Sequence, residues 1–436
     1  MPVRYFPTGH SAREIVDSVE AGLRDRTLRP GQNLPTVRGL AAALGLSPAT
    51  VAGAYRELRA RGVVAGDGRR GTRVRDGPAI GGAPGIIVPP GVRDLANGGP
   101  DLALLPPLPA LAGSHRCRGY GEPSVSASLG RLAREQFAAD GVDATHLAVT
   151  GGALDGVERV LGAWLRPGDR VAVEDPGYPA VLDLVAAMAL DAVPVAMDDS
   201  GPRPEALARV LGRGVAAMVL TPRAHNPTGA CWGESRTAEL AETIRPFPDV
   251  LVIEDDHAGP VAGAPLRTLS SGRLRWTVIR SVSKSLGPDL RLATTAGDEA
   301  TVARMEGRQA LGTGWVSYLL QDLVTQLWTD PSAHRILEQT ALTYAARRRA
   351  LVEALAEHAI PARGSSGLNV WVPVPQEHPV LAGLLQAGWA VAPGERFRMA
   401  SPPAVRISVA TLGQDEAPQL ASDLAGCVSH SAVRLG

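Results

Sequence analysis

A single lysine is the chain's clearest candidate for covalent chemistry. Of the 44 basic residues, 43 are arginine, and the remaining one is Lys284. Since a guanidinium does not act as a nucleophile, this composition indicates that position 284 needs a primary amine, whose pKa can fall on burial and which can form a Schiff base. Ser281 and Ser283 precede this lysine, and Arg291 follows it. An amine, two hydroxyls and a guanidinium fork suit a cofactor that carries an aldehyde and a phosphate.

Four further motifs carry groups that could complete such a site. In TGGA (150–153) a strand is expected to meet a helix, so the amides of Gly152 and Ala153 could hold phosphate at the positive end of the helix dipole. The other motifs are HNPTG with Asn226, VIEDDHAG with Asp255 and His257, and AVRISVA with Arg406. Any one of these residues alone could be structural, as a strand-end cap is. Their order around the one lysine favours a common site.

The motif SVSKSLGPDLRLA (281–293) and those around it resemble the aspartate-aminotransferase superfamily of fold type I, which uses pyridoxal 5′-phosphate. The resemblance covers residues 93–420. It implies that Lys284 attaches the cofactor, that Asn226 hydrogen-bonds its phenolic oxygen, and that Asp255 keeps its pyridine nitrogen protonated. The other implied cofactor contacts are those of Gly152, Ala153, Tyr178, Ser281, Ser283 and Arg291, and of Tyr120 reaching the phosphate of a neighbouring subunit.

Three more expectations follow from this resemblance. Arg406 matches the arginine that clamps the α-carboxylate of an amino acid. His257 stands where the most similar relatives have a tyrosine that touches the phenolic oxygen, so the cofactor's environment is expected to differ here. His225 is expected to be a loop residue, because in this superfamily the released lysine carries the protons.

The first 75 residues are basic, with thirteen arginines against six acidic residues, and the rest of the chain is correspondingly acidic. Hydrophobic spacing, helix caps and turn residues predict three helices and a hairpin, at residues 10–26, 36–44, 47–61 and 63–74. Ser47 is a good N-cap, and Pro48 suits the first position of a helix. Three helices and a wing make a winged helix-turn-helix, and residues 34–64 strongly resemble the GntR family of transcription regulators.

This resemblance implies that the third helix enters the major groove of DNA while the wing contacts phosphate or the minor groove. The residues expected to bind DNA are Arg38, Ser47, Ala49, Thr50, Arg69, Arg70 and Arg73. The family often has arginine directly after the serine, whereas this chain has Pro48, so one expected contact is missing.

Residues 76–92 are rich in glycine and proline and are expected to be a linker. Beyond it, apolar runs alternate with helical stretches, which predicts an α/β body at 93–436 with a mostly parallel sheet covered on both faces. We expect a large part at 93–300 and a smaller C-terminal part at 301–436. The arginine run at 347–349 is expected on a solvated helix face rather than on nucleic acid.

Several classes of protein are disfavoured by the sequence. No apolar segment reaches the roughly 18 residues of a membrane span, and the start lacks the apolar core of a signal peptide, so a cytoplasmic protein without a membrane is expected. The cysteines, Cys117, Cys231 and Cys427, are too few and too far apart for a disulfide framework or a metal site. We expect these cysteines to be buried and to pack as small hydrophobic residues, and we expect no bound metal.

The order of the two halves resembles the MocR subfamily of bacterial regulators. This resemblance implies a homodimer that binds operator DNA through its head and senses pyridoxal 5′-phosphate, or an amino acid or other amine, through its body. Two alternatives remain open on the residues. The body could be a working aminotransferase whose DNA-binding head is secondary, or the cofactor itself could be the signal in a regulator of vitamin B6 supply.

Overall fold

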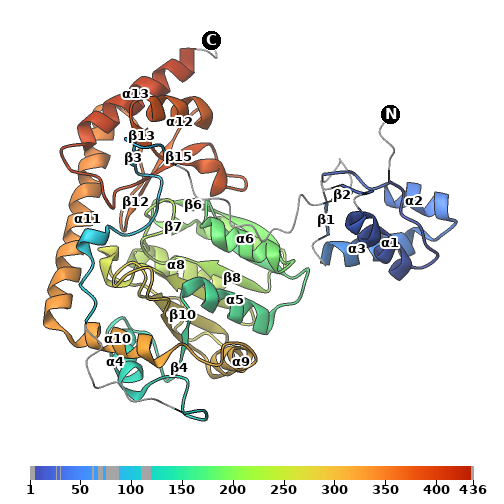
Figure 1. Ribbon diagram of the computed structural model, residues 1–436, viewed down its shortest axis with the longest axis horizontal. Helices are drawn as coiled ribbons and strands as arrows, with labels where there is room; N and C mark the ends of the chain where they lie inside the picture. The colour runs from blue at the N-terminus through green and yellow to red at the C-terminus, as the bar shows by residue number, and fades with distance from the viewer. Residues whose placement is uncertain are drawn as a thin grey trace. The chain divides into compact units, whose positions relative to one another are not determined.

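The computed structural model describes residues 5–25, 27–29, 31–60, 63–66, 72–74, 88–109 and 119–433. The chain divides into two compact units, a small one that contains residues 1–84 and a large one that contains most of residues 85–436 (Figure 1). We call residues 5–74 the head and residues 88–433 the body. Arg69, Arg70, Cys117 and positions 76–87 of the expected linker lie outside the described residues.

The head has the expected elements. They are α1 (Ala12–Arg24), α2 (Val37–Leu44), α3 (Pro48–Ala60) and an antiparallel pair of strands, β1 (Val64–Gly66) and β2 (Thr72–Val74). Local chemistry sets the helix ends: the Thr36 side chain accepts from the amide of Gly39 at the start of α2, and Gly45 ends that helix with φ of 66°. Ser47 Oγ accepts from the Thr50 amide at 3.1 Å, so the expected cap of α3 is present.

The head has a hydrophobic core of its own. Its fully buried members include Ile15, Val16, Val19, Leu40, Val51, Tyr55 and Leu58. Tyr55 also donates its hydroxyl to the carbonyl of Pro35 at 2.8 Å, which satisfies the polar end of a buried ring. The helices therefore hold one another independently of the rest of the chain.

The body is built on an eight-stranded sheet in the order β4-β11-β10-β9-β8-β5-β6-β7. The strands are β4 (His146–Thr150), β5 (Arg170–Asp175), β6 (Asp191–Asp198), β7 (Gly201–Pro202), β8 (Ala217–Leu220), β9 (Leu251–Asp256), β10 (Trp276–Ser281) and β11 (Ala293–Gly297). β8, β9 and β10 run parallel, and β11 is antiparallel to both β10 and β4. Since nearly every residue of β8 to β10 is buried, these strands are continuous apolar runs, as expected for a mostly parallel sheet.

Helices cover this sheet (Figure 1). In chain order they are α4 (Ala127–Ala139), α5 (Ala153–Trp164), α6 (Pro179–Ala187), α7 (Pro204–Leu211), α8 (Glu234–Ile244), α9 (Glu299–Ala310) and α10 (Tyr318–Thr329). α5 and α9 pack against each other and against β10 and β11. The sheet therefore presents only the ends of its strands for polar chemistry.

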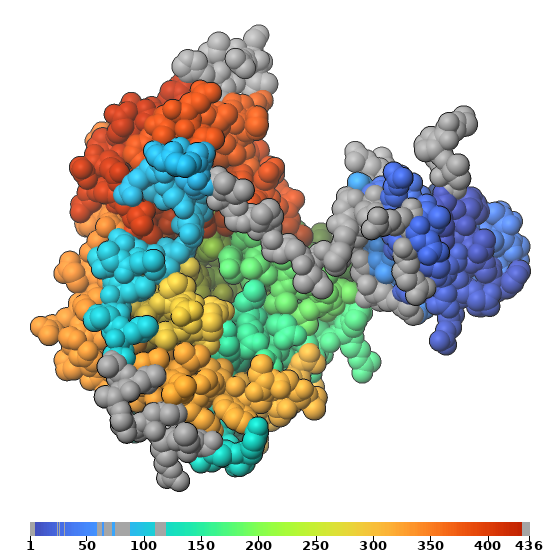
Figure 2. Space-filling model, in the orientation of Figure 1, coloured from blue at the N-terminus to red at the C-terminus, as the bar shows by residue number. Residues whose placement is uncertain are grey.

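A smaller C-terminal part follows the sheet. The long helix α11 (Pro331–Glu357) leads into β12 (Asn369–Pro373), α12 (Glu377–Gln386), β13 (Trp389–Ala390), β14 (Ala392–Pro393), β15 (Ala404–Ser408) and α13 (Ala417–Val433). Near the start of the body, β3 (Arg93–Asp94) pairs with β13, so the following residues are tied to this part. In Figure 2 the light-blue segment around residue 100 accordingly runs over the body next to the red C-terminal part.

Two expectations about side chains are wrong. Arg347 forms an ion pair with Asp101 at 3.0 Å, and Arg348 is buried, with both ends of its fork donating to the carbonyls of Gly367 and Ser365. The arginine run thus includes structural residues, because a guanidinium can satisfy several buried carbonyls at once. The described cysteines, Cys231 and Cys427, are free and half-buried rather than buried.

Candidate functional site

The candidate residues of the body gather at the carboxyl ends of parallel strands. Gly152 follows β4, Tyr178 follows β5, Asn226 follows β8, and Asp255 lies near the end of β9. Lys284 follows β10. Ligands of α/β proteins bind at this edge, because strands of one direction bring their following loops together there.

Lys284 is held by the segment that opens the body. Its Nζ donates to the carbonyl of Gly98 at 2.6 Å. Burial, together with the charge of Arg406, lowers the pKa of the Lys284 amine to about 8, although Asp255 opposes this shift. An appreciable fraction of the amine is therefore neutral near neutral pH, which a nucleophilic amine requires.

The hydroxyls and the guanidinium expected around a phosphate do lie together. Ser281 Oγ donates to Ser283 Oγ at 3.1 Å, and Arg291 Nη1 donates to Ser283 Oγ at 3.3 Å. Gly152 lies against the same guanidinium: its φ is 111°, and a Cβ there would lie 2.4 Å from Arg291 Nη2. The glycine therefore brings the backbone before α5, which begins at Ala153, up to the cluster.

The carboxyl of Asp255 is buried and incompletely hydrogen-bonded. Within the described residues, its Oδ1 has no hydrogen-bond partner. Burial, with the neighbouring charges of Asp256 and Glu174, raises the pKa of Asp255 to about 7, and Lys284 opposes this shift only in part. A cationic group placed beside it would satisfy this carboxylate.

The next residue along β9 has the opposite environment. Asp256 points to the other face of the sheet, where it accepts from Arg223 at 2.7 and 2.9 Å and from Arg280 at 2.7 Å. Although burial opposes the shift, these two guanidiniums hold the pKa of Asp256 below its ordinary value. Arg280 also pairs with Asp140 at 2.5 Å. Asp256 is therefore the centre of a buried ion-pair network, adjacent in sequence to the unpaired carboxyl.

A second buried pair was not foreseen. His225 is fully buried, with Nδ1 2.7 Å from Thr228 Oγ1 and Nε2 3.2 Å from Glu174 Oε2. Glu174 Oε2 also accepts from the amide of Thr221 at 3.0 Å. The expectation of an ordinary loop residue at 225 is incomplete, because His225 joins β5 to the loop that carries Asn226. A histidine within HNPTG and an acidic residue ending another strand were the available signals.

Arg406 is buried at the centre of β15. Its Nη1 donates to Asn226 Oδ1 at 3.3 Å, its Nη2 donates to the carbonyl of Ala96, and its Nε has no partner in the described part of the chain. Its guanidinium carbon lies 5.0 Å from the centre of the Phe397 ring. Burial, followed by the charge of Arg396, lowers the pKa of Arg406 to about 10. An anion reaching this guanidinium would meet a desolvated cation.

Two further candidates border the same space. Burial, with Asp255 next, raises the pKa of the Tyr178 hydroxyl, and Arg291 and Arg406 oppose this shift, so the ring lies in the electrostatic range of all three groups. Burial and the Lys284 amine lower the pKa of His257 to about 4, so its imidazole is neutral at neutral pH. A neutral imidazole can donate one hydrogen bond.

Tyr120 stands apart from the other candidates. Its side chain is 95% exposed, and its ring contacts Trp315 edge-on with a centroid distance of 5.8 Å. A single chain therefore does not bring Tyr120 into contact with Lys284 or its neighbours.

We expect the ligand-free protein to lose stability as pH rises from about 4, near the ordinary pKa of an aspartate, to about 7. The folded pKa of Asp255, about 7, lies above its ordinary value, so the folded state binds this proton more tightly than the unfolded chain does. The resulting stabilisation is complete at low pH and is lost as pH rises through about 7. Asp255→Asn should flatten this decline, measured as the thermal midpoint over a pH series.

Asp249→Asn is the matched control for this experiment, because Asp249 is an exposed acid whose ion pair with Arg275 spans 3.4 Å. It should leave the decline unchanged. Equal declines in wild type and Asp255→Asn would contradict the assignment. Glu254, whose pKa burial also raises to about 7, remains in every variant and gives a decline of the same sign, which His257, whose pKa burial lowers to about 4, opposes below its ordinary pKa.

The head presents a separate candidate surface for DNA. At the start of α3, Ser47 and Ala49 are exposed and Thr50 is half-buried, and Arg38 is exposed in the first turn of α2. Arg73, on β2, is exposed and donates its Nε to the carbonyl of Gly31 at 2.8 Å. The five described residues expected to contact DNA are thus accessible at least in part.

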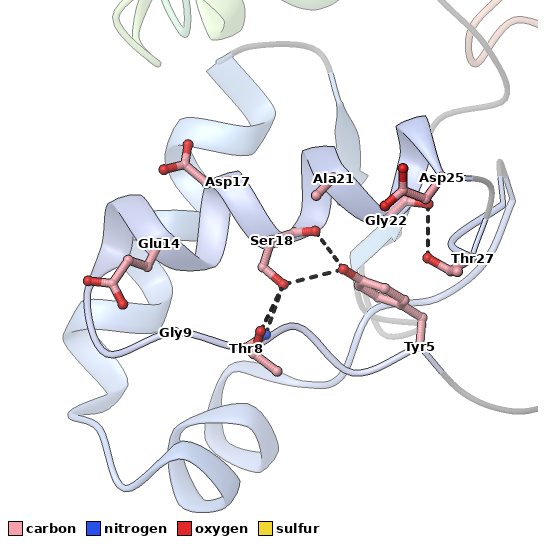
Figure 3. A pocket seen from close by; sticks show the side chains of 10 residues that line it. All are labelled: Tyr5, Thr8, Gly9, Glu14, Asp17, Ser18, Ala21, Gly22, Asp25 and Thr27. Atoms are coloured by element: carbon pink, nitrogen blue, oxygen red, sulfur yellow. Dashed lines mark hydrogen bonds between the residues drawn. The ribbon is translucent and has the colours of Figure 1, made fainter.

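An acidic surface of the head lies along α1. A groove of about 460 Å³ there is lined by the carboxylates of Glu14, Asp17 and Asp25 together with hydroxyl groups (Figure 3). Tyr5 donates its hydroxyl to the carbonyl of Ser18 at 2.5 Å on its floor. Because carboxylates repel phosphate, this face of the head is unsuited to binding DNA.

Comparison with known proteins identifies a family for each part of the chain. Residues 11–74 match the family described as bacterial regulatory proteins, gntR family, and residues 108–424 match aminotransferase class I and II. The vitamin B6 salvage pathway transcriptional repressor PtsJ of Salmonella typhimurium is 39% identical over 95% of this chain and 98% of its own length. The chain belongs to the MocR-type regulators of the GntR family.

Other relatives of this MocR-type regulator are more distant. The pyridoxine biosynthesis regulator PdxR of Corynebacterium glutamicum is 29% identical over 56% of each chain. Among solved structures, kynurenine aminotransferase of Pyrococcus horikoshii has a TM-score of 0.70 at 21% identity, covering 78% of this chain and 91% of its own. LysN of Thermus thermophilus, complexed with N-(5′-phosphopyridoxyl)-L-leucine, has a TM-score of 0.69 at 21% identity, covering 79% and 94%. The body of the regulator therefore has the aminotransferase fold.

Two absences apply to the described residues of the regulator. No helix there is both long and apolar enough to cross a membrane. Nor do those residues contain a group of three or more histidine, cysteine or acidic side chains placed to hold a metal ion.

Proposed function

We propose that this regulator binds pyridoxal 5′-phosphate in its body and that occupancy of this site by the cofactor or an amino compound changes how the head binds operator DNA. The observation that carries the proposal is the unpartnered, buried Asp255 beside Lys284 in a site with cationic ends. Such a site is incomplete without a ligand that is cationic next to Asp255 and anionic at Arg291.

The side chains fit this cofactor group by group. Lys284 would attach its aldehyde carbon, Asp255 would hold the proton on its ring nitrogen, and Asn226 would donate to its phenolic oxygen. Its phosphate would be held by the remaining cluster, which comprises Gly152, Ala153, Ser281, Ser283 and Arg291. When bound, the cofactor supplies an aldehyde that captures primary amines and a ring that withdraws electrons.

The other residues would shape what enters the site. Tyr178 would cover the ring, and His257 would donate a single hydrogen bond from its neutral imidazole. Arg406 would bind a carboxylate after exchanging its contacts with Asn226 and Ala96, which makes an α-amino acid one suitable effector. The name of PtsJ, which refers to vitamin B6 salvage, supports the cofactor itself as the other candidate signal.

An aminotransferase function is the second candidate. It is favoured by the gathering of Lys284, Asp255 and Asn226 at one edge of the sheet, where Arg406 of β15 reaches Asn226 at 3.3 Å. These are the groups that such a reaction uses. His257 in place of tyrosine favours a sensor instead. Amino acid added to cofactor-loaded protein separates the two: continuous release of keto acid supports an enzyme, and a single spectral change without turnover supports a sensor.

A homodimer is part of the proposal. The exposed ring of Tyr120 packs against Trp315, and Leu311 nearby in sequence is 91% exposed, so this apolar surface would gain from cover by a second chain. In a dimer, Tyr120 would reach the phosphate of the partner subunit. Two heads on one dimer would then bind two half-sites of an operator.

We expect DNA binding to weaken steeply as salt rises, because phosphate contacts by arginines release counterions. Arg38→Ala should weaken binding to the chain's own upstream region by about 1–3 kcal/mol and lower the preference over random duplex. Fluorescence anisotropy of the full-length protein over a salt series measures both effects.

Arg69→Ala and Arg245→Ala complete that experiment. Arg69 should contribute equally to all sequences, whereas Arg245, an exposed arginine of the body, should contribute nothing. A wild-type protein without preference for any genomic fragment over random duplex would refute operator binding. Adding pyridoxal 5′-phosphate to the same titration tests whether the body controls the head.

A further inference from the structure

A short segment of the C-terminal part is hydrogen-bonded to two acidic residues, one on each side of it. We call residues 394–404, which run from the start of η4 (Gly394–Arg396) to the start of β15, the strap. On one side it is held by Glu377, the first residue of α12. Glu377 Oε2 accepts from the amide of Glu395 at 2.7 Å, and Oε1 accepts from Arg398 Nε at 2.8 Å and from the amide of Ala404 at 3.2 Å.

On the other side, the strap is held by Asp175 at the end of β5. Oδ1 of this buried carboxylate accepts from the amide of Met399 at 2.8 Å and from the hydroxyl of Ser401 at 3.0 Å. Oδ2 accepts from the amides of Ala400 and Ser401 at 2.8 and 2.9 Å. Four donors on one carboxylate fix both its position and that of the residues that donate.

A fifth hydrogen bond joins the same two segments. The amide of Gly177 donates to the carbonyl of Phe397 at 2.7 Å. Gly177 precedes Tyr178, so the turn that carries the candidate ring is attached to the strap through both Asp175 and Gly177. The resemblance places residues 175–178 in the turn that carries the ring, and of these only Tyr178 was expected to contact the cofactor.

The strap also reaches the candidate carboxylate clamp. The ring of Phe397 lies under the Arg406 guanidinium at 5.0 Å and meets Trp371 edge-on at 6.0 Å. One continuous set of contacts therefore runs from Arg406 through Phe397 and the strap to Asp175 and Tyr178. Its two ends are the carboxylate end and the ring end of the ligand proposed above.

We infer that Asp175 is a positioning residue, which couples the occupancy of Arg406 to the placement of Tyr178 through the strap. This inference rests on the proposed function. A carboxylate bound at Arg406 replaces the contacts with Asn226 and Ala96 and neutralises the guanidinium, which weakens its attraction for the Phe397 ring and so changes the free energy of the strap's position. Because Asp175 ties the strap to the Tyr178 turn, that change reaches the ring end of the site. A cofactor without a carboxylate would leave the strap as it is.

Two probes separate these ends of the site in the full-length protein. N-(5′-phosphopyridoxyl)-L-leucine and pyridoxamine 5′-phosphate carry the same pyridine ring and phosphate. Of the two, only the leucine adduct also carries an α-carboxylate. Hydrogen exchange of the amides at 399–401 reports on the strap, and the absorbance and fluorescence of the bound pyridine ring report on the Tyr178 end. In wild type, we expect the leucine adduct, and not pyridoxamine 5′-phosphate, to change both signals.

Asp175→Asn replaces one acceptor oxygen with a donor of nearly the same size. Without ligand, exchange at 399–401 should be faster by about tenfold or more, the size expected when charge-assisted hydrogen bonds are lost. The leucine adduct should no longer change the ring signal, while affinity for pyridoxamine 5′-phosphate should stay within about threefold, because no cofactor contact has been removed. A merely structural role would not produce this selective loss.

Glu377→Gln is the matched control, because it loosens the same strap from its other side. It should speed exchange at 395 and 404 yet keep the ring response to the leucine adduct. Ser401→Ala removes a single donor and should weaken that response in part, which also provides a readout if Asp175→Asn does not fold. An undiminished ring response in both Asp175→Asn and Ser401→Ala would overturn the inference alone. If the wild type binds neither probe, the proposed function is overturned and the inference with it.

Discussion

Lys284→Ala should abolish every covalent attachment of pyridoxal 5′-phosphate to the chain. Lys284 supplies the one side-chain primary amine of the sequence, and burial lowers the pKa of that amine to about 8. Borohydride reduction followed by mass spectrometry should add one phosphopyridoxyl group to wild type and none to the variant. We also expect cofactor affinity to fall about a hundredfold or more, which corresponds to about 3 kcal/mol.

Lys284→Arg distinguishes amine chemistry from charge. It retains a cation next to Asp255 but no nucleophile, so it should keep weak binding without a reducible adduct. If either variant purified from the same cells retains a reducible adduct, Lys284 is not the attachment residue. If wild type forms no reducible adduct but Lys284→Ala still loses cofactor affinity, covalent attachment is contradicted and a non-covalent cofactor site is supported.

Asp256→Ala should destabilise the body by about 3–5 kcal/mol, because it leaves the buried Arg223 without its carboxylate and Arg280 with Asp140 alone. Arg223 is 6% and Arg280 4% exposed, so water cannot replace the lost partner. The free energy of unfolding of the body in denaturant is the measurement. Asp249→Ala, at an exposed ion pair, should change it by no more than about 0.5 kcal/mol.

The pH dependence of Asp256 has the opposite sign to that of Asp255. The folded pKa of Asp256 is lowered by Arg280 and Arg223 against the cost of burial, so its stabilisation is present above its ordinary pKa. It is lost only as pH falls through the lower folded value. If Asp256→Ala lowers the free energy of unfolding by less than about 1 kcal/mol at neutral pH, the buried network is contradicted.

The sequence predicted the parts of the structure that depend on short-range patterns. The three head helices, the Ser47 cap and the hairpin all lie where the spacing and turn residues placed them. The apolar runs of β8, β9 and β10 were recognisable because strands covered on both faces carry no polar alternation. The antiparallel strand β11 was not foreseen, since the direction of a strand is set by its neighbours.

The candidate site was predictable to the extent that one residue could be matched to one role. Lys284, Asp255 and Arg406 were found because each belongs to a motif with a chemical requirement. Glu174 with His225, and Asp175 with its strap, were missed because their partners lie far away in sequence and on other elements. The roles of the matched residues, those of Arg69 and Arg70 in DNA binding among them, remain predictions.

The three acids of β9 have a consequence for how this chain can change over generations. Glu254 and Asp256 face one side of the sheet, where hydroxyl, amide and guanidinium groups receive them, and Asp255 faces the other. An insertion or deletion of one residue upstream in β9 would turn each of them to the wrong side. The unpaired acid would then meet two arginines, and an acid built for those arginines would enter the site. The chemistry and the cohesion of the body would therefore be lost together in a single slip.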